Sequence, residues 1–190
     1  MIINDKALVR LMKYAQKNGG YRIAMTKGDP EWIYIAGPDW YVGAQLDKLP
    51  PKVLGELVTQ LKGLLHPGQA CQIFKKTIQD EYFDSVTIPI FELDEARKTM
   101  QKNDQVRVTP TPMDWRDRRV CRREDGEILL LNPLILDVVD RFTWAALQVG
   151  EWVIYDAGEE QVYIMPEEPL SCDVDFIEKI AALWAAHEEE

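Results

Sequence analysis

Short runs of aromatic and β-branched residues, each closed by Gly, Pro, Asn or Asp, constrain this 190-residue chain more than any other feature. Runs of this composition favour strands, and the residues that close them favour tight turns. Asp125-Gly126 is typical of a two-residue hairpin turn because it tolerates positive φ, and Lys27-Gly28-Asp29-Pro30 predicts another hairpin. The expected strands are residues 21–25, 31–36, 40–44, 70–76, 86–91, 120–124, 127–131, 152–156 and 161–165.

Amphipathic segments separate these strand pairs and predict helices. The first covers residues 5–17, with Asn4 or Asp5 as its N-cap. A second begins at Pro50-Pro51 and ends at His66-Pro67-Gly68. Its expected buried stripe is Leu54, Leu57, Val58, Leu61, Leu64 and Leu65. Further helices are expected over residues 94–102, from Asn132-Pro133 through Phe142 to a stop at Gly150, and after an Asp173 cap. The fold class is therefore α+β, with antiparallel strand pairs alternating with helices.

The order of these elements suggests two similar halves. Each half reads as ββαββα, which either a duplication or the convergence of a common pattern would produce. We expect an N-terminal half over residues 1–104 and a C-terminal half over 105–190, or one continuous domain that contains both. The proline-rich segment 109–112 is expected to be an irregular crossing between them.

Charge is divided unevenly between the two parts of the chain. Residues 1–123 carry 20 Lys and Arg against 15 Asp and Glu, whereas residues 124–190 carry 2 against 17. The formal net charge is −10. A chain this acidic repels a polyanion at long range, which argues against generic DNA binding.

Five of the chain's arginines gather immediately before the acidic part: Arg116, Arg118, Arg119, Arg122 and Arg123. If residues 118–123 form a strand, its arginines alternate between both faces, so an edge or protruding strand is expected. These arginines either pair with the acidic part within the molecule, or they bind a small phosphorylated or carboxylated ligand.

The acidic part has two interpretations as well. A carboxylate-rich surface is most often a solvated face that keeps a protein in solution. It can also be presented to the basic groove of a protein partner. The candidate partner-binding residues are Asp137, Asp140, Glu151, Asp156, Glu159, Glu160, Glu167 and Glu168.

Catalytic motifs are absent from the sequence. His66 and His187 are its only histidines; the first is expected to follow a helix end and the second lies in an acidic tail. Cys121 lies between arginines that would lower its pKa, but it has no histidine partner, so a small buried hydrophobe is the better interpretation. No phosphate-binding loop or metal-ligand spacing occurs, so we expect no cofactor and no metal, and we favour a non-enzymatic protein.

The expected compartment is the cytoplasm. Cys71, Cys121 and Cys172 are odd in number and widely spaced, which suits a reducing environment. The sequence shows neither a signal peptide nor an apolar run long enough to span a bilayer.

The opening Met1-Ile2-Ile3-Asn4-Asp5-Lys6, with Leu49-Pro50-Pro51-Lys52-Val53-Leu54 further on, resembles small uncharacterised proteins of bacteriophages and mobile elements over the first 65 residues or so. The resemblance implies a host-interaction or inhibitor role, including inhibition of CRISPR nucleases and other defence proteins. Three hypotheses follow: a binding module that presents acidic residues to a basic partner, a binder or enzyme for a small anionic ligand, and a structural subunit of a larger assembly.

Overall fold

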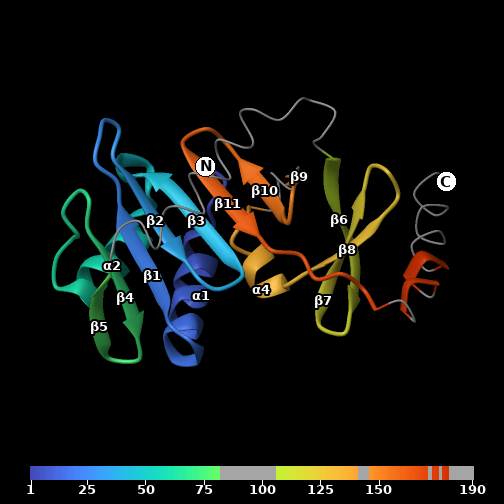
Figure 1. Cartoon of the computed structure of the whole chain (residues 1–190), viewed down its shortest axis with the longest axis horizontal. Helices are drawn as coiled ribbons and strands as arrows, with labels where there is room; N and C mark the ends of the chain where they lie inside the picture. The colour runs from blue at the N-terminus through green and yellow to red at the C-terminus, as the bar shows by residue number, and fades with distance from the viewer. Residues whose placement is uncertain (82–105, 141–145, 171–172, 176, 180–190) are drawn as a thin grey trace.

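The protein is built on one large antiparallel sheet. The computed structural model describes residues 1–81, 106–140, 146–170, 173–175 and 177–179. Eleven strands lie side by side in the order β5-β4-β1-β2-β3-β11-β10-β9-β6-β7-β8 (Figure 1). The strands are β1 (Tyr21–Met25), β2 (Trp32–Ala36), β3 (Trp40–Gln45), β4 (Ala70–Phe74), β5 (Thr77–Glu81), β6 (Val106–Trp115), β7 (Arg118–Arg123), β8 (Ile128–Leu131), β9 (Ala146–Val149), β10 (Trp152–Asp156) and β11 (Glu160–Ile164). The α+β class with antiparallel strand pairs is confirmed.

Strands from the two parts of the chain join at the centre of this sheet. β3 and β11 pair from Glu160 opposite Ala44 to Ile164 opposite Trp40. Trp40, Val42 and Ile164 are all buried there, which fixes the register. The expected halves 1–104 and 105–190 therefore share one continuous sheet.

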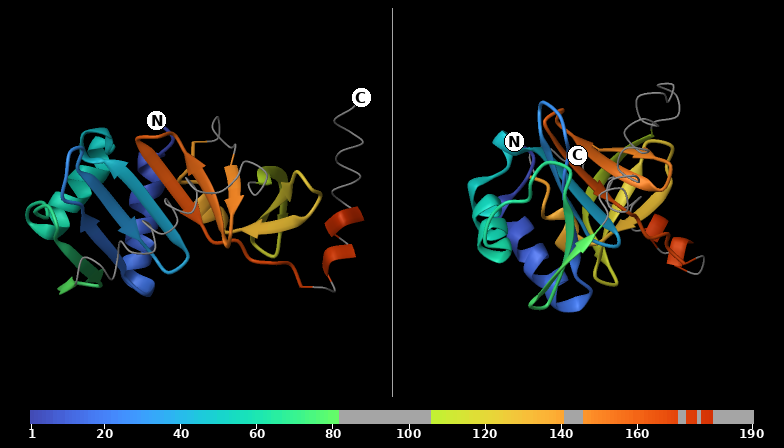
Figure 2. Two further views of the ribbon diagram at one scale, coloured as in Figure 1. Left: turned by 45° about the horizontal axis from the view of Figure 1, so that its top comes forward. Right: turned by 60° about the vertical axis from the view of Figure 1, so that its left-hand side comes forward.

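Helices from the first 140 residues cover one face of the sheet, as the right-hand view of Figure 2 shows. They are α1 (Asp5–Asn18), α2 (Pro51–Leu61) and the single turn α4 (Pro133–Leu136), with a 3-10 turn at Leu46–Lys48. The main core lies between these helices and the sheet. It includes Leu8 and Met12 of α1, Leu57 of α2 and Ile35 of β2.

The N-terminal segment is tied into the middle of the molecule. The amide of Asn4 donates to Val138 (2.7 Å), and the amide of Asp140 donates to the carbonyl of Ile2 (2.7 Å). The Asn4 side chain then caps α1 by accepting from the amide of Ala7 (3.2 Å), as the sequence predicts. α1 is thereby held beside α4, near the centre of the sheet.

The predicted extent of α2 is wrong at its C-terminal end. The helix stops at Leu61, because Lys62 adopts the left-handed conformation that closes many helices. The residues that α2 buries fully are Val53 and Leu57, whereas Val58 and Leu64 are 40% and 39% exposed. The apolar periodicity of the sequence continues past Leu61, but the helical conformation does not.

The predicted irregular crossing at 109–112 is also wrong, since these residues lie within β6. Among the described residues, β9 pairs only with Val106–Val108, so β7 is the one described neighbour of β6 at the prolines. The register shifts between Pro110 and Asp114. Proline lacks an amide proton, and it is tolerated at a bulge of this kind.

Two further expectations fail in the second part of the chain. Gly150 turns between β9 and β10 with φ 58° and does not end a helix. α4 is a single turn, capped as expected by Asn132, whose side chain accepts from the amide of Leu134 (3.0 Å). The strand expected at 86–91, the helix at 94–102 and the position Phe142 lie outside the described residues.

Candidate functional site

The arginine-rich strand β7 lies inside the sheet. β6 and β8 flank it, so the expectation of an edge strand is wrong. Val120 packs with Leu130 and Ile177 on one face, while Cys121 joins the main core on the other. Both residues are completely buried, because their neighbours on each side are apolar. The arginines are displaced to the ends of β7, where their side chains reach the surface.

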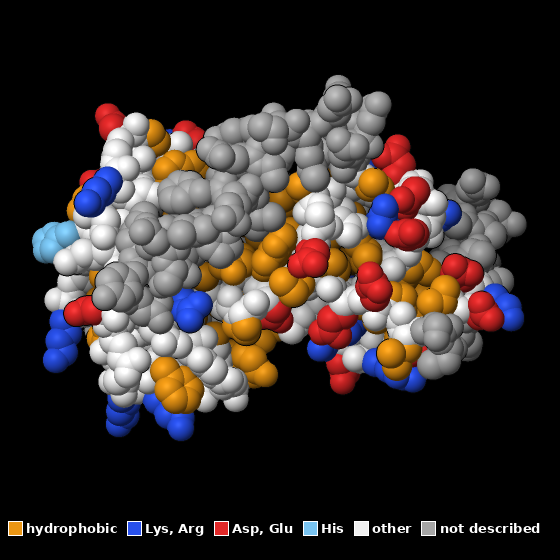
Figure 3. Space-filling model, in the orientation of Figure 1, with side chains coloured by type: hydrophobic (Ala, Val, Ile, Leu, Met, Phe, Trp, Pro, Cys, Tyr) orange, Lys and Arg blue, Asp and Glu red, His pale blue; other side chains and the backbone are white. Residues whose placement is uncertain are grey.

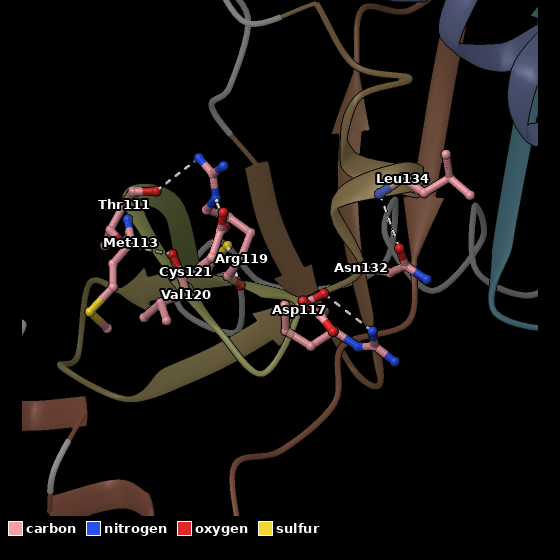
Figure 4. A network of polar contacts seen from close by, with 10 residues as sticks. Thr111, Met113, Asp117, Arg119, Val120, Cys121, Asn132 and Leu134 are labelled. Carbon is pink, nitrogen blue, oxygen red and sulfur yellow. Dashed lines mark hydrogen bonds and ion pairs between the residues drawn. The ribbon is translucent and has the colours of Figure 1, made fainter.

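Four of the five arginines form ion pairs with nearby carboxylates. Arg116 pairs with Asp173 (3.1 Å) and Arg118 with Glu167 (2.8 Å), both in the acidic part of the chain. Arg119 pairs with Asp114 (2.6 Å) and also donates to the carbonyl of Thr111 (Figure 4). Arg123 lies between Asp125 (2.5 Å) and Glu127.

The strand register separates these arginines. Arg118 and Arg122 share the face of Val120, and Arg119 and Arg123 share the face of Cys121. Arg122 is exposed and has no ion-pair partner among the described residues. The cluster thus does not converge on one ligand position, and its main contacts are internal.

Cys121 does not have the properties of a reactive thiol. Burial raises its pKa to about 12, and the opposing effect of the Arg119 charge is smaller. The charge of Arg119 acts to lower this pKa, as the sequence suggests, but burial has the larger effect, and Cys121 is the small buried hydrophobe that the sequence favours.

Glu160 is not a surface residue, contrary to expectation. Its side chain lies at the start of β11, where the residue is only 4% exposed. Its Oε2 accepts hydrogen bonds from the amides of Ile2 and Ile3, the second at 3.4 Å. A buried carboxylate needs such donors, and here they come from the N-terminal segment.

Two adjoining cavities lie on either side of Met1 and Pro51, and we call them together the Met1 groove. The larger has a volume of about 720 Å³ and the smaller about 420 Å³. Asp137 and Asp140 line the larger, and Glu159 and Glu160 line the smaller. The fold therefore brings half of the predicted partner-binding carboxylates to one region.

Other charged residues of the groove come from the N-terminal part of the chain. Asp5, Lys6 and Arg10 line the larger cavity, and Asp47 and Lys48 the smaller. No sequence motif marks them, because they become neighbours of the acidic residues only through the pairing of β3 with β11. In the sequence they occupy ordinary helix or turn positions, so nothing there marks them as candidate site residues.

Exposed ion pairs bridge the groove walls. Arg10 of α1 pairs with Asp137 (2.7 Å), and Lys48 pairs with Glu159 (3.6 Å). Lys52 pairs with Asp5 (2.8 Å), and its hydrogen bond lowers the pKa of that carboxyl. In each of these pairs at least one side chain is more than 40% exposed, so each pair remains in contact with water.

The remaining predicted carboxylates lie elsewhere. Glu151 and Glu168 are exposed, Glu167 is held by Arg118, and Asp156 caps its own turn by accepting from the amide of Gly158 (2.8 Å). Figure 3 shows acidic side chains scattered over this face of the molecule, without a single dense patch. Within the described residues, no three His, Cys, Asp or Glu side chains could together hold a metal ion.

Comparison with known proteins leaves the family open. No protein-family model matches the chain, and no curated protein matches it. No helix in the described part of the chain combines the length and apolar character that crossing a membrane requires.

Distant likenesses exist among solved structures. The DNA polymerase III β chain of Streptococcus pneumoniae TIGR4 aligns at 7% identity and a TM-score of 0.40, over 92% of this chain and 67% of its own. The β subunit from Borrelia burgdorferi, solved with a natural product, aligns at 8% identity and 0.37, over 87% and 61%. A putative β subunit from Eubacterium rectale aligns at 12% and 0.36, over 86% and 62%. Likeness at this level carries no functional inference.

Proposed function

We propose that this protein is a non-catalytic binding module whose Met1 groove receives a basic segment of a protein partner. The observation that carries the proposal is that two pairs of acidic residues line adjoining cavities. Asp137 and Asp140 line one cavity, Glu159 and Glu160 line the other, and both cavities share Met1 and Pro51. Eighteen residues separate the two acidic pairs in the sequence. A concave site with convergent charged groups is the usual place for recognition.

The charge of the groove suits a cationic partner. Its acidic lining residues are Asp5, Asp47, Asp137, Asp140, Glu159 and Glu160, and its basic ones are Lys6, Arg10 and Lys48. The lining is therefore net acidic, and complementary potential steers a basic partner toward it.

The ion pairs within the groove do not prevent such binding. Exposed pairs such as Arg10–Asp137 contribute only about 0–1 kcal/mol to stability. A partner's Lys or Arg can displace Arg10 or Lys48 at small cost, and the displaced side chain returns to water. Glu160 is not available to a partner in this way, because its carboxylate already accepts hydrogen bonds from the amides of Ile2 and Ile3.

The partner class in this proposal is a protein with a nucleic-acid-binding groove, such as a defence nuclease. Grooves of that kind are lined by Lys and Arg, and a Lys- or Arg-rich segment of the groove wall can enter the Met1 groove and so be withheld from nucleic acid. The resemblance of the first 65 residues to phage and mobile-element proteins supports an inhibitor of this type. The acidic residues supply the chemistry for that role.

Charge reversal tests the groove. In the triple variant Asp137→Lys, Asp140→Lys, Glu159→Lys, binding of a fluorescent ten-residue Lys/Arg peptide is expected to weaken at least tenfold, about 1.4 kcal/mol. Glu160 is left intact because the fold needs it.

A matched control separates the site from net charge. The triple variant Glu124→Lys, Glu151→Lys, Glu168→Lys changes the net charge equally at three exposed positions outside the groove. It is expected to retain most of the binding. Equal loss in both triples would show only a long-range charge effect and would contradict a site in the groove.

A further inference from the structure

Among the described strands, β5 forms one edge of the sheet. It pairs with β4 on one side, and no described residue pairs with its other side. Figure 1 shows the β4–β5 hairpin at the end of the sheet farthest from β8, and Figure 2 shows it from two more directions. An edge strand presents unpaired N–H and C=O groups that another strand can bind.

The opposite edge of the sheet is protected. On the outer side of β8, the amide of Leu130 donates to the carbonyl of Glu167 (3.0 Å), and the amide of Glu167 donates back (2.8 Å). The segment after β11 thereby covers that edge. β5 has no such cover within the described ranges, and it carries neither proline nor a bulge.

The side chains of β5 are unusual for a free edge. Ile78 lies opposite Ile73 of β4, which is buried in the main core, yet Ile78 is 44% exposed. The apolar row that runs from Tyr21 through Ile73 therefore ends at Ile78 with one side open to solvent.

Alternate residues of β5 direct their backbone groups outward. The turn of the hairpin is Lys75-Lys76, and Phe74 and Thr77 flank it as a pair. In a two-residue hairpin the flanking pair exchanges hydrogen bonds, so Thr77 and Gln79 face β4. The N–H and C=O groups of Ile78 and Asp80 then point away from the sheet.

We infer that β5 pairs antiparallel with β5 of a second copy of this chain, around a two-fold axis at Ile78. In this register Ile78 lies opposite its own counterpart, and Lys76 of each copy lies opposite Asp80 of the other. Ile78 and Asp80 direct their backbone groups outward, as pairing requires, and Lys76, in the turn, contributes its charge at the end of the paired segment. The pairing is isologous, so it closes at two copies.

Charge selects this register and this partner. β5 is preceded by a basic residue, Lys76, and ends in acidic ones, so an antiparallel copy places opposite charges together at both ends. Opposite charges across a strand pair stabilise it, and like charges destabilise it. The two Ile78 side chains meet on the helix-covered side and extend the core row formed by Ile73. This inference does not depend on the Met1 groove.

Charge exchange tests the pairing. Sedimentation velocity is expected to give a dimer of twice 21.9 kDa for the unmodified chain. Asp80→Lys or Lys76→Asp alone is expected to weaken dimerisation at least tenfold, because like charges then face each other at two places. The double variant Lys76→Asp, Asp80→Lys restores opposite charges and is expected to restore the dimer. A monomer at every concentration, or a double variant no better than the singles, would overturn the inference.

Cross-linking fixes the register independently. Hydrogen-bonded partners in an antiparallel pair lie about 5.5 Å apart at Cα, within reach of a disulfide. Ile78→Cys is therefore expected to give a disulfide-linked dimer on mild oxidation, and the unmodified chain is not. Gln79→Cys, whose side chains lie on the other face and off the axis, is the matched control. Cross-linking of Gln79→Cys as efficient as that of Ile78→Cys would rule out this register.

Discussion

The carboxylate of Glu160 accepts hydrogen bonds from the backbone amides of Ile2 and Ile3, and so joins the first residues of the chain to its last described strand. The three residues are each no more than 5% exposed. The contact holds the N-terminal segment against β11 and shapes the wall between the two cavities of the Met1 groove.

Loss of this carboxylate is expected to destabilise the protein. Glu160→Ala leaves two buried amides without an acceptor, and hydrogen bonds to a charged group contribute about 1.5–3 kcal/mol each. We expect the free energy of unfolding in urea to fall by about 3 kcal/mol. Glu159→Ala, at the exposed neighbouring position, is expected to change it by less than about 1 kcal/mol. Equal effects at both positions would contradict the buried role of Glu160.

Substitutions in α2 compare two residues of its predicted buried stripe, of which the structure buries only one. Leu57→Ala removes a fully buried side chain and is expected to cost about 2–5 kcal/mol of unfolding free energy. Val58→Ala, at a position 40% exposed, is expected to cost well under about 1 kcal/mol. Chemical denaturation of both variants provides the measurement, and a larger cost at Val58 would mean that the helix presents a different face.

Adjacent arginines of β7 are expected to differ in their contribution to stability. Arg123 is 18% exposed at its side chain and contacts Asp125 and Glu127, whereas Arg122 is exposed. Arg123→Ala is expected to lower the unfolding free energy by about 1–2 kcal/mol, through lost packing as well as lost ion pairs. Arg122→Ala is expected to stay within about 0.5 kcal/mol of the unmodified protein. Thermal unfolding of both variants provides the measurement. A larger loss of stability for Arg122→Ala than for Arg123→Ala would contradict the ion pairs of Arg123.

The thiol of Cys121 is expected to be unreactive in the folded protein. Burial raises its pKa to about 12, so the thiol stays protonated at pH 8 and cannot act as a nucleophile. In a Cys172→Ser background, iodoacetamide is expected to modify neither buried cysteine under native conditions and both in denaturant, as mass spectrometry would show. Rapid native labelling of Cys121 would contradict its place in the core.

The carboxyl of Asp39 is expected to make stability depend on pH. Burial raises its pKa above the ordinary value of 3.8, the charge of Glu167 adds to this effect, and Arg118 opposes it. A carboxyl with a raised folded-state pKa favours the folded state when protonated, and this contribution is lost as pH rises through that pKa. Asp39→Asn is therefore expected to match the unmodified protein at pH 3 and to be slightly more stable at pH 7. Urea titrations at the two pH values test the sign.

The sequence by itself determined the local elements of this protein. Periodicity and turn residues place α1 and the strands β1, β2, β3, β8, β10 and β11 almost to the residue, because 3.6-residue and two-residue patterns depend only on neighbours along the chain. They did not predict β5, β6 or β9. The Asn4 and Asn132 caps follow from the same local chemistry.

Tertiary structure decided the limits of elements and the partners of charges. The prolines of β6 are tolerated at a bulge beyond its described pairing with β9, and β7 is interior because β6 and β8 pair with it on either side. Glu160 is buried because β11 pairs with β3 and brings it beside Ile2. Burial and ion pairing depend on contacts between residues far apart in the sequence. The local charge pattern therefore does not show which carboxylate is buried against backbone amides and which stays exposed to water.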